Sequence, residues 1–201
     1  MATIVMSGPQ NITLDGVIQD PDGGEGWEHG GWFVEHGGDD LAAWSQIALE
    51  EANAAAAWLL GRRSYEFFST RWEPRDGDLA DRLRAIPKYV VSSTLRDPGW
   101  NNTTVLGGDA VQAVTSLKEH VDGEIVIPAS HQLGRTLLEH GLVDEVRLVV
   151  FPVVVGAGDR FFDGVGSVMP MQLTGTRTIG GGLVLLAYRP ARSDSSGPAG
   201  S

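Results

Sequence analysis

Two arginines follow an apolar run that ends in glycine, in the segment Trp58-Leu59-Leu60-Gly61-Arg62-Arg63-Ser64. The run predicts a buried strand that breaks at Gly61 and leads into a helix capped by Ser64. A helix N-terminus offers unpaired N–H groups and a partial positive charge, which favour anions. In a chain of net charge −11, Gly61, Arg62, Arg63 and Ser64 therefore indicate a phosphate-binding turn. The alternative is that Gly61 only turns the chain and both arginines are solvated.

Hydroxyl side chains follow a second predicted strand, in Val90-Val91-Ser92-Ser93-Thr94. Ligands of open α/β sheets bind at the carboxyl ends of the strands, so Ser92 and Ser93 are candidates for holding a ribose phosphate. Serine and threonine are also ordinary turn formers, and that reading stays open.

A third strand, turn and helix start lies in Ile125-Val126-Ile127-Pro128-Ala129-Ser130-His131-Gln132-Leu133. It offers a second place for a pyrophosphate, with Ser130 as the predicted helix cap. A serine beside a histidine also raises the possibility of a hydrolase. Neighbours at a helix start do not orient as nucleophile and base, and no third orienting group is evident, so hydrolysis is disfavoured.

Other polar residues suggest less specific chemistry. The pair Asp39-Asp40 precedes an apolar helical run and either caps it or supplies a cleft carboxylate that binds or protonates a heterocycle. The spacing of Glu28, His29, Glu35 and His36 fits no standard metal motif, so no metal site is expected.

Composition bounds the class of protein. With 201 residues, 42% of them hydrophobic, we expect one compact domain over residues 1–192 and a flexible tail over 193–201. The absence of cysteine excludes disulfides, thiol nucleophiles and cysteine zinc sites, and is consistent with a cytoplasmic protein. We expect neither a membrane span nor a signal peptide, and the net charge argues against nucleic-acid binding.

The elements that must position these residues alternate along the chain. Short β-branched runs predict eight strands, at Thr3–Ser7, Ala55–Leu60, Lys88–Ser92, Thr103–Leu106, Glu124–Ile127, Glu145–Val155, Met171–Thr176 and Leu183–Arg189. Helical periods lie at Asp40–Ala54, Tyr65–Trp72, Leu79–Ala85, Ala110–His120 and His131–His140, with Asp109 as a cap and Gly141 as a left-handed end. This order predicts an α/β architecture with a mostly parallel sheet and an antiparallel edge. The long segment Gly16–Gly38 has no clear period and is a candidate active-site lid.

Several motifs together resemble the family that includes dihydrofolate reductase and the C-terminal reductase domain of riboflavin biosynthesis, over roughly Thr3 to Pro190. They are Thr13-Leu14-Asp15-Gly16, Leu59-Leu60-Gly61-Arg62-Arg63-Ser64-Tyr65-Glu66, Ile86-Pro87-Lys88-Tyr89-Val90-Val91-Ser92, Trp100-Asn101-Asn102-Thr103-Thr104, Leu137-Leu138-Glu139-His140-Gly141-Leu142-Val143-Asp144-Glu145 and Pro152-Val153-Val154-Val155-Gly156-Ala157-Gly158. The resemblance implies a three-layer dihydrofolate-reductase-like fold with a mixed sheet of eight or nine strands, NADPH as cofactor, and a homodimer.

The resemblance also implies roles for particular residues. Gly61, Arg62, Arg63 and Ser64 match the family's turn for the cofactor phosphates, and Ser92 and Ser93 match its hydroxyl pair near the adenosine 2′-phosphate. A second phosphate-binding turn is matched by Ala129, Ser130, His131, Gln132 and Leu133, although the family usually has glycine where this chain has Ala129. Asp40 corresponds to the pterin-binding carboxylate, and Asp15 is the second candidate catalytic carboxylate.

The sequence therefore leads us to expect hydride transfer from NADPH to a C=N or C=O carbon of a small pterin- or pyrimidine-like substrate. Asp40 or a bound water would supply the proton. The alternative is a binding protein on the same fold that holds a small ligand or a partner chain.

Overall fold

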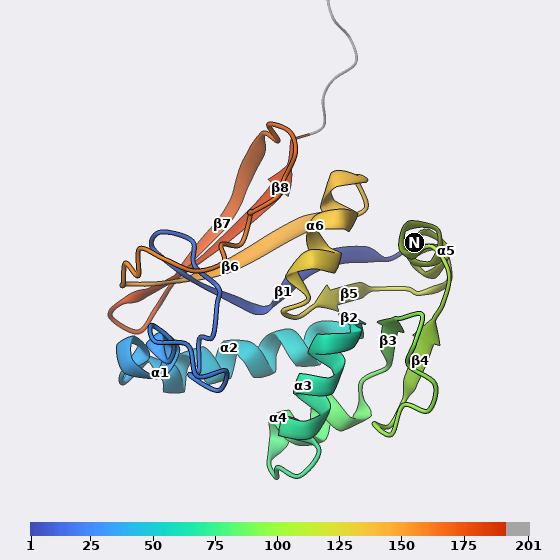
Figure 1. Ribbon diagram of the computed structural model, residues 1–201, viewed down its shortest axis with the longest axis horizontal. Coiled ribbons are helices and arrows are strands. Elements are labelled where there is room, and N and C mark those ends of the chain that lie inside the picture. The colour runs from blue at the N-terminus through green and yellow to red at the C-terminus, as the bar shows by residue number, and fades with distance from the viewer. Residues whose placement is uncertain (192–201) are drawn as a thin grey trace, which may run out of the picture.

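The computed structural model describes residues 1–191, and the predicted tail over 193–201 lies outside them. Eight strands form one sheet in the order β4-β3-β2-β5-β1-β6-β8-β7 (Figure 1). The strands are β1 (Thr3–Thr13), β2 (Ala55–Gly61), β3 (Lys88–Val91), β4 (Thr103–Leu106), β5 (Glu124–Ile127), β6 (Glu145–Phe151), β7 (Met171–Ile179) and β8 (Leu183–Pro190). The helices are α1 (Trp32–Gly37), α2 (Asp40–Ala54), α3 (Arg62–Trp72), α4 (Asp78–Ala85), α5 (Ala110–His120) and α6 (His131–Glu139).

The strands from β4 to β6 in this order run parallel, and β8 and β7 add an antiparallel pair at one edge. The predicted eight strands and antiparallel edge are confirmed. β6 ends at Phe151 rather than at Val155, because Pro152 lacks the N–H that a ladder needs. β7 is an edge strand of nine residues, most of them exposed.

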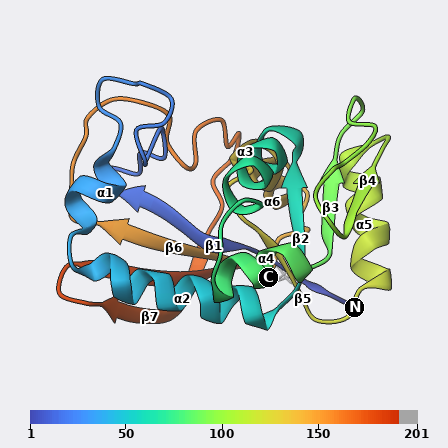
Figure 2. The same ribbon diagram turned by 90° about the horizontal axis from the view of Figure 1, so that it is seen from below.

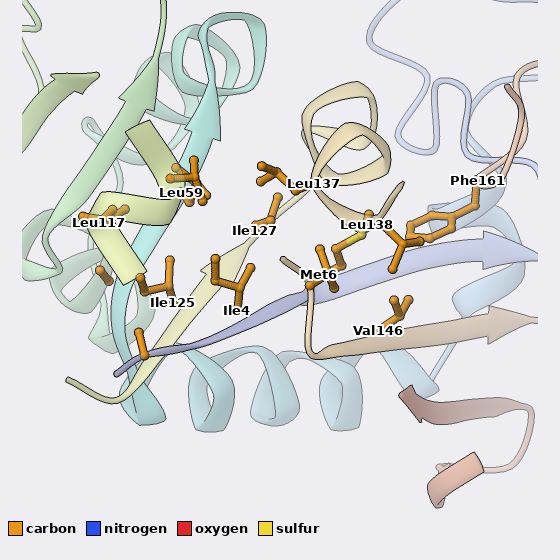
Figure 3. Close-up of a cluster of buried hydrophobic side chains, with 14 of the residues drawn as sticks. Ile4, Met6, Leu59, Leu117, Ile125, Ile127, Leu137, Leu138, Val146 and Phe161 are labelled. Carbon is orange, nitrogen blue, oxygen red and sulfur yellow. The ribbon is translucent and has the colours of Figure 1, made fainter. Parts of the chain in front are cut away.

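Helices cover both faces of the sheet, because strands such as β2 bury side chains alternately on each face. On one face Leu59 and Met6 belong to one buried cluster with Leu117 of α5 and Leu137 and Leu138 of α6, and Figure 3 shows Met6 beside Leu138. On the other face Trp58 packs in a cluster with α2, α3 and α4, and α2 lies below the sheet in Figure 1. The architecture is therefore the three-layer α/β arrangement that was expected.

A bulge interrupts β1 where it passes the ends of its neighbours. Its pairing with β6 shifts from Met6 opposite Val146 to Gln10 opposite Leu148, so three residues lie opposite one. Gly8, within the bulge, has φ 99° and lies so close to Pro128 that an added Cβ would come within 2.9 Å of the proline Cβ. The bulge therefore contacts the turn that follows β5.

The segment Gly16–Gly38 is folded and includes α1, which the sequence did not predict. The buried carboxylate of Asp20 accepts hydrogen bonds from the N–H groups of Glu25 and Trp27, at 2.9 and 3.0 Å. Asp22 forms an ion pair with Arg71 of α3. The Asp20 hydrogen bonds hold the segment together internally, and the Asp22–Arg71 pair ties it to α3. Its opening as a lid stays a prediction.

Among residues 1–191, no helix has the length and apolar character that crossing a bilayer requires.

Candidate functional site

Three of the polar turns identified from the sequence lie at one edge of the sheet. β3, β2 and β5 are neighbours and parallel, so the residues after Val91, Gly61 and Ile127 leave the sheet on the same side. Figure 2 shows the starts of α3 and α6 close together beyond the end of β2. The carboxyl edge of a parallel sheet is where such folds bind ligands.

Two serines join these turns directly. The Ser130 Oγ accepts a hydrogen bond from the Gly61 N–H at 3.0 Å, and the Ser64 Oγ accepts one from the Ser130 N–H at 3.0 Å. The predicted side-chain caps are therefore wrong. α3 begins at Arg62 with Gly61 as its N-cap, and neither Ser64 nor Ser130 caps its own helix, because each side chain bonds the other turn.

The N-termini of α3 and α6 consequently have no side-chain cap. α5 shows the contrast, because Asp109 accepts from the Gln112 N–H at 2.9 Å, as predicted. The predicted left-handed conformation of Gly141 is also confirmed, with φ 68°. The first-turn N–H groups of α3 and α6 remain available to an anion.

The space in front of the first turn is open. A Cβ added at Gly61 would meet only the Ser130 Oγ, at 3.9 Å. Arg62 and Arg63 are exposed beside it, and the Arg62 guanidinium donates to the Thr94 hydroxyl at 2.6 Å and to the Glu66 carboxylate at 2.7 Å. Open space, a helix N-terminus and two guanidinium groups suit a phosphorylated cofactor.

The two serines after β3 differ in their contacts. The Ser92 Oγ accepts from the N–H groups of Thr94 and Leu95, at 3.2 and 3.0 Å, which is the turn-forming arrangement. Ser93 is exposed on the same turn.

Ala129 and Ser130 both have left-handed backbones, with φ 47° and 44°. This conformation costs free energy in a residue with a Cβ, whereas glycine adopts it freely.

His131 follows at the start of α6 and makes an edge-to-face contact with Phe161, with ring centroids 5.5 Å apart. Burial, together with the nearby Arg135 charge, lowers the pKa of His131 to about 4, so its imidazole is neutral at pH 7. Gln132 is exposed and Leu133 packs against the core.

The two carboxylates proposed as catalytic lie in loop contacts. The Asp40 oxygens accept from the N–H groups of Gly181 and Gly182, at 2.8 and 2.7 Å, in the turn between β7 and β8. Asp15 accepts from the Thr13 hydroxyl at 2.6 Å and from the Gly156 N–H at 2.8 Å. Burial alone would raise the pKa of Asp15, but these hydrogen bonds outweigh it and lower the pKa to about 2.

Sequence reasoning missed a third carboxyl group, Glu51 of α2, which lines a cavity between α2, α3 and the sheet. Glu51 is 8% exposed, and its Oε2 accepts from the Ser7 hydroxyl at 2.6 Å and the Gly8 N–H at 3.0 Å. Burial raises its pKa, against these hydrogen bonds and the attraction of Arg147, which lower it. The signal was present in the sequence, because Glu51 falls on the buried stripe of α2 with Ile47 and Ala48.

Residues of the β1 bulge and its end lie between the cavity and the turn that follows β5. Gly8 lines the cavity and contacts Pro128, and Gln10 donates from its side chain to the Ile127 and Ala129 carbonyls, at 2.6 and 3.3 Å. The β1 bulge therefore lies between Glu51 and the turn that precedes α6.

Within residues 1–191, no three His, Cys, Asp or Glu side chains gather as metal ligands would. The His29 Nε2 instead lies 3.6 Å from the Glu28 Oε1, and both side chains are exposed.

Comparison with known proteins finds one matching family model, one curated relative and several solved structures of the same fold. A family model described as the RibD C-terminal domain matches residues 10–185. The uncharacterized protein YyaP of Bacillus subtilis (strain 168) is 29% identical over 136 residues, which make up 65% of this chain and 71% of YyaP.

Three solved structures are similar at low sequence identity. A proposed riboflavin biosynthesis protein from Shewanella sp. PV-4 gives a TM-score of 0.72 at 20% identity, covering 96% of this chain and 100% of that one. The diaminohydroxyphosphoribosylaminopyrimidine deaminase/5-amino-6-(5-phosphoribosylamino)uracil reductase of Thermotoga maritima gives a TM-score of 0.63 at 18% identity, covering 94% of this chain and 57% of that one. Dihydrofolate reductase from Enterococcus faecalis, complexed with NADP(H), gives a TM-score of 0.59 at 14% identity, covering 96% of this chain and 97% of that one. These likenesses show a dihydrofolate-reductase-like fold.

Proposed function

The chain belongs to the RibD C-terminal domain family, and from that premise we propose that it is an NADPH-dependent reductase of a small heterocyclic compound. The observation that carries the proposal is the meeting of two uncapped helix N-termini, α3 and α6, joined through Ser64 and Ser130. Two adjacent sets of free N–H groups suit the two phosphates of a dinucleotide.

In this proposal each turn binds a different part of the cofactor. Gly61, Arg62, Arg63 and Ser64 hold one phosphate, and the turn from Ala129 to Leu133 holds the other. Ser92 and Ser93 lie on the turn nearest Arg62, where a 2′-phosphate would gain charge-assisted hydrogen bonds. His131, being neutral, contributes a dipole rather than a charge.

NADPH would supply a hydride, and the protein must then orient the substrate, exclude water and provide a proton. Asp40 and Asp15 are the proton donors proposed from sequence, yet both already accept hydrogen bonds from loop backbone groups. Glu51 lines the cavity and has a raised pKa, which keeps a proton available nearer to neutral pH. We therefore set Glu51 first among the three. Asp40 acts in the proposal by fixing α2 against the β7–β8 turn.

The proposal is tested by titrating NADPH and NADH against the purified protein in a calorimeter. NADPH should bind at least about tenfold more tightly, because each charge-assisted hydrogen bond to the extra phosphate contributes about 1.5–3 kcal/mol. Equal dissociation constants would refute the proposed 2′-phosphate contacts.

The alternative function is a binding protein that has lost cofactor affinity. The two successive left-handed residues without glycine, Ala129 and Ser130, favour it, because a Cβ there stands where a cofactor must approach. Failure of both NADPH and NADH to bind would select this alternative.

We also propose a homodimer. Within the described part of the chain, β7 offers a long exposed edge with unpaired backbone groups for a second copy. Sedimentation of the purified protein would measure its oligomeric state.

A further inference from the structure

The turn between β5 and α6 adopts a left-handed conformation without glycine. Ala129 and Ser130 have φ 47° and 44°, in the region where a Cβ crowds the following carbonyl oxygen. The segment from Ile127 to His131 contains no glycine that would adopt this conformation freely. Contacts from the rest of the chain must therefore stabilise the turn, because its own residues favour other conformations.

The neighbouring strands supply these contacts from two sides. β5 lies between β2 and β1 in the sheet, so the turn that follows it contacts the ends of both. On the β2 side, Ser130 accepts a hydrogen bond from Gly61 and donates one to Ser64. Both bonds use atoms of Ser130, and neither uses atoms of Ala129. The contacts of Ala129 come from the β1 side.

Gln10 of β1 binds this side of the turn. It is 2% exposed, and its Nε2 lies 2.6 Å from the carbonyl oxygen of Ile127, 3.3 Å from that of Ala129 and 3.2 Å from that of Ser7. Carbonyl oxygens only accept hydrogen bonds, so the group that faces all three must be the amide NH2. An apolar side chain or an ionised carboxylate in place of this amide would leave the three oxygens without their donor.

The bulge in β1 brings Gln10 to the turn. Pairing of β1 with β6 resumes at Gln10 after the bulge, and Gly8 within the bulge lies so close to Pro128 that a Cβ would come within 2.9 Å of the proline Cβ. Ile127 and Ala129, whose carbonyls Gln10 binds, are the two residues on either side of Pro128. One amide group therefore bridges the backbone across this proline.

We infer that Gln10 is a positioning residue, which holds Ala129 in its left-handed conformation and thereby keeps the first turn of α6 directed toward its ligand. The inference rests on the proposed function only in naming NADPH as that ligand. Gln10 acts through Ala129 and does not touch the cofactor. If the turn occupied its binding conformation only part of the time, the apparent dissociation constant would rise by the inverse of that fraction.

The test is a double-mutant cycle on the full chain. Gln10→Met keeps the approximate volume of the side chain and removes the donor. It should raise the NADPH dissociation constant about tenfold or more, as the loss of hydrogen bonds to these carbonyls requires. In an Ala129→Gly background the same change should raise it about threefold or less, because glycine adopts the left-handed conformation unaided.

Two controls separate this role from a general loss of packing. In an Ala157→Gly background, where no left-handed residue is replaced, Gln10→Met should keep its full effect. Gln172→Met, exposed on β7, should leave NADPH binding unchanged. If Gln10→Met does not fold, Gln10→Asn takes its place in the cycle, since it keeps the amide on a side chain shorter by one methylene.

The urea midpoint of each variant is measured as well, without cofactor. It should fall more for Gln10→Met in the wild-type background than in the Ala129→Gly background. An equal fall in both backgrounds would overturn the inference, and so would an unchanged dissociation constant for Gln10→Met in a protein that binds NADPH. Rescue of the midpoint by Ala129→Gly in a protein that takes up no NADPH would uphold the role of Gln10 and reject the proposed reductase.

Discussion

The Ser64 hydroxyl accepts a hydrogen bond from the backbone N–H of Ser130 at 3.0 Å, across 66 residues of sequence. With the bond from Gly61 to the Ser130 hydroxyl, it makes the starts of α3 and α6 one unit. A cofactor that binds both helix N-termini therefore depends on the spacing that these two bonds set.

The first prediction concerns this pair. Ser64→Ala and Ser130→Ala should each lower the free energy of unfolding by about 1–3 kcal/mol, because each leaves a partly buried N–H without an acceptor. Both should also weaken NADPH binding. The double variant should lose less than the sum of the two, since the two bonds hold the same junction between α3 and α6. Denaturant titration and calorimetry measure both quantities, and Ser69→Ala, elsewhere on α3, is the control. If the losses of the two single variants add up to the loss of the double variant, Ser64 and Ser130 are not coupled.

The second prediction concerns the arginines at the start of α3. Arg62→Ala should weaken NADPH binding about tenfold or more and NADH binding less, because Arg62 reaches Thr94 on the turn proposed for the 2′-phosphate, which NADH lacks. Arg63→Ala should weaken the binding of both cofactors, because Arg63 is proposed to hold a phosphate that both carry. Arg177→Ala, on β7 and paired with Glu50, is the matched control for the loss of one positive charge. A parallel loss of NADPH and NADH affinity in Arg62→Ala would place Arg62 away from the 2′-phosphate.

The third prediction concerns Ala129. Ala129→Gly should tighten NADPH binding by about 5- to 150-fold, which corresponds to the cost of about 1–3 kcal/mol for an overpacked contact. Removing the Cβ also relieves the left-handed conformation at φ 47°. Ala157→Gly, in an exposed loop without a positive φ, controls for the greater freedom of the unfolded chain. An unchanged affinity would mean that Pro128 and Ala129 form a turn that already clears the cofactor.

The fourth prediction concerns Asp15, whose folded pKa of about 2 lies below its ordinary value of 3.8. A lowered carboxyl pKa stabilises the fold above pH 3.8, and that stability disappears as the pH falls through 2. Asp15→Asn should therefore lower the free energy of unfolding at pH 6, and the difference from wild type should shrink toward pH 2. Urea titrations at several pH values measure it, with the exposed Asp97→Asn as control. A difference that does not change with pH would show that charge is not responsible.

The fifth prediction concerns Glu51, whose pKa is shifted in the opposite direction to that of Asp15. The pKa of Glu51 is raised, so its contribution to stability is present below its ordinary pKa of 4.5 and is lost as the pH rises through the folded value. Arg147 from β6 and Glu124 from β5 are the charged groups that face it. Relative to wild type, Glu51→Gln should therefore become more stable as the pH rises from 4 to 8. The same urea titrations measure this change, and a difference that falls with pH would contradict the raised pKa.

Local patterns sufficed for much of the fold. The helical spacing of apolar residues predicts the bounds of α2 and α5, and the Asp109 cap marks where α5 begins. Each of these signals involves residues that are only a few positions apart in sequence. The position of Gly61 at the end of β2 follows from an apolar run that stops at a glycine. Such signals depend on near neighbours in sequence.

The site was less predictable, because its contacts join distant segments. Ser64 and Ser130 have the residue type and position of helix caps, and only the adjacency of β2 and β5 shows that each bonds the other turn. Glu51 becomes a cavity residue through the bulge in β1, which brings Ser7 and Gly8 to it. Asp40 similarly finds its partners more than a hundred residues away, in the β7–β8 turn.

The attachment of α2 to the antiparallel edge has a consequence for solution behaviour. α2 is bound to the β7–β8 hairpin through Asp40 and through the ion pair of Glu50 with Arg177, and the same helix carries Glu51 and Ala48 into the cavity. Association of a second chain along β7 would act on the helix that forms the cavity wall. Ligand affinity and self-association would then be thermodynamically linked, and by reciprocity the ligand's apparent dissociation constant would change with protein concentration.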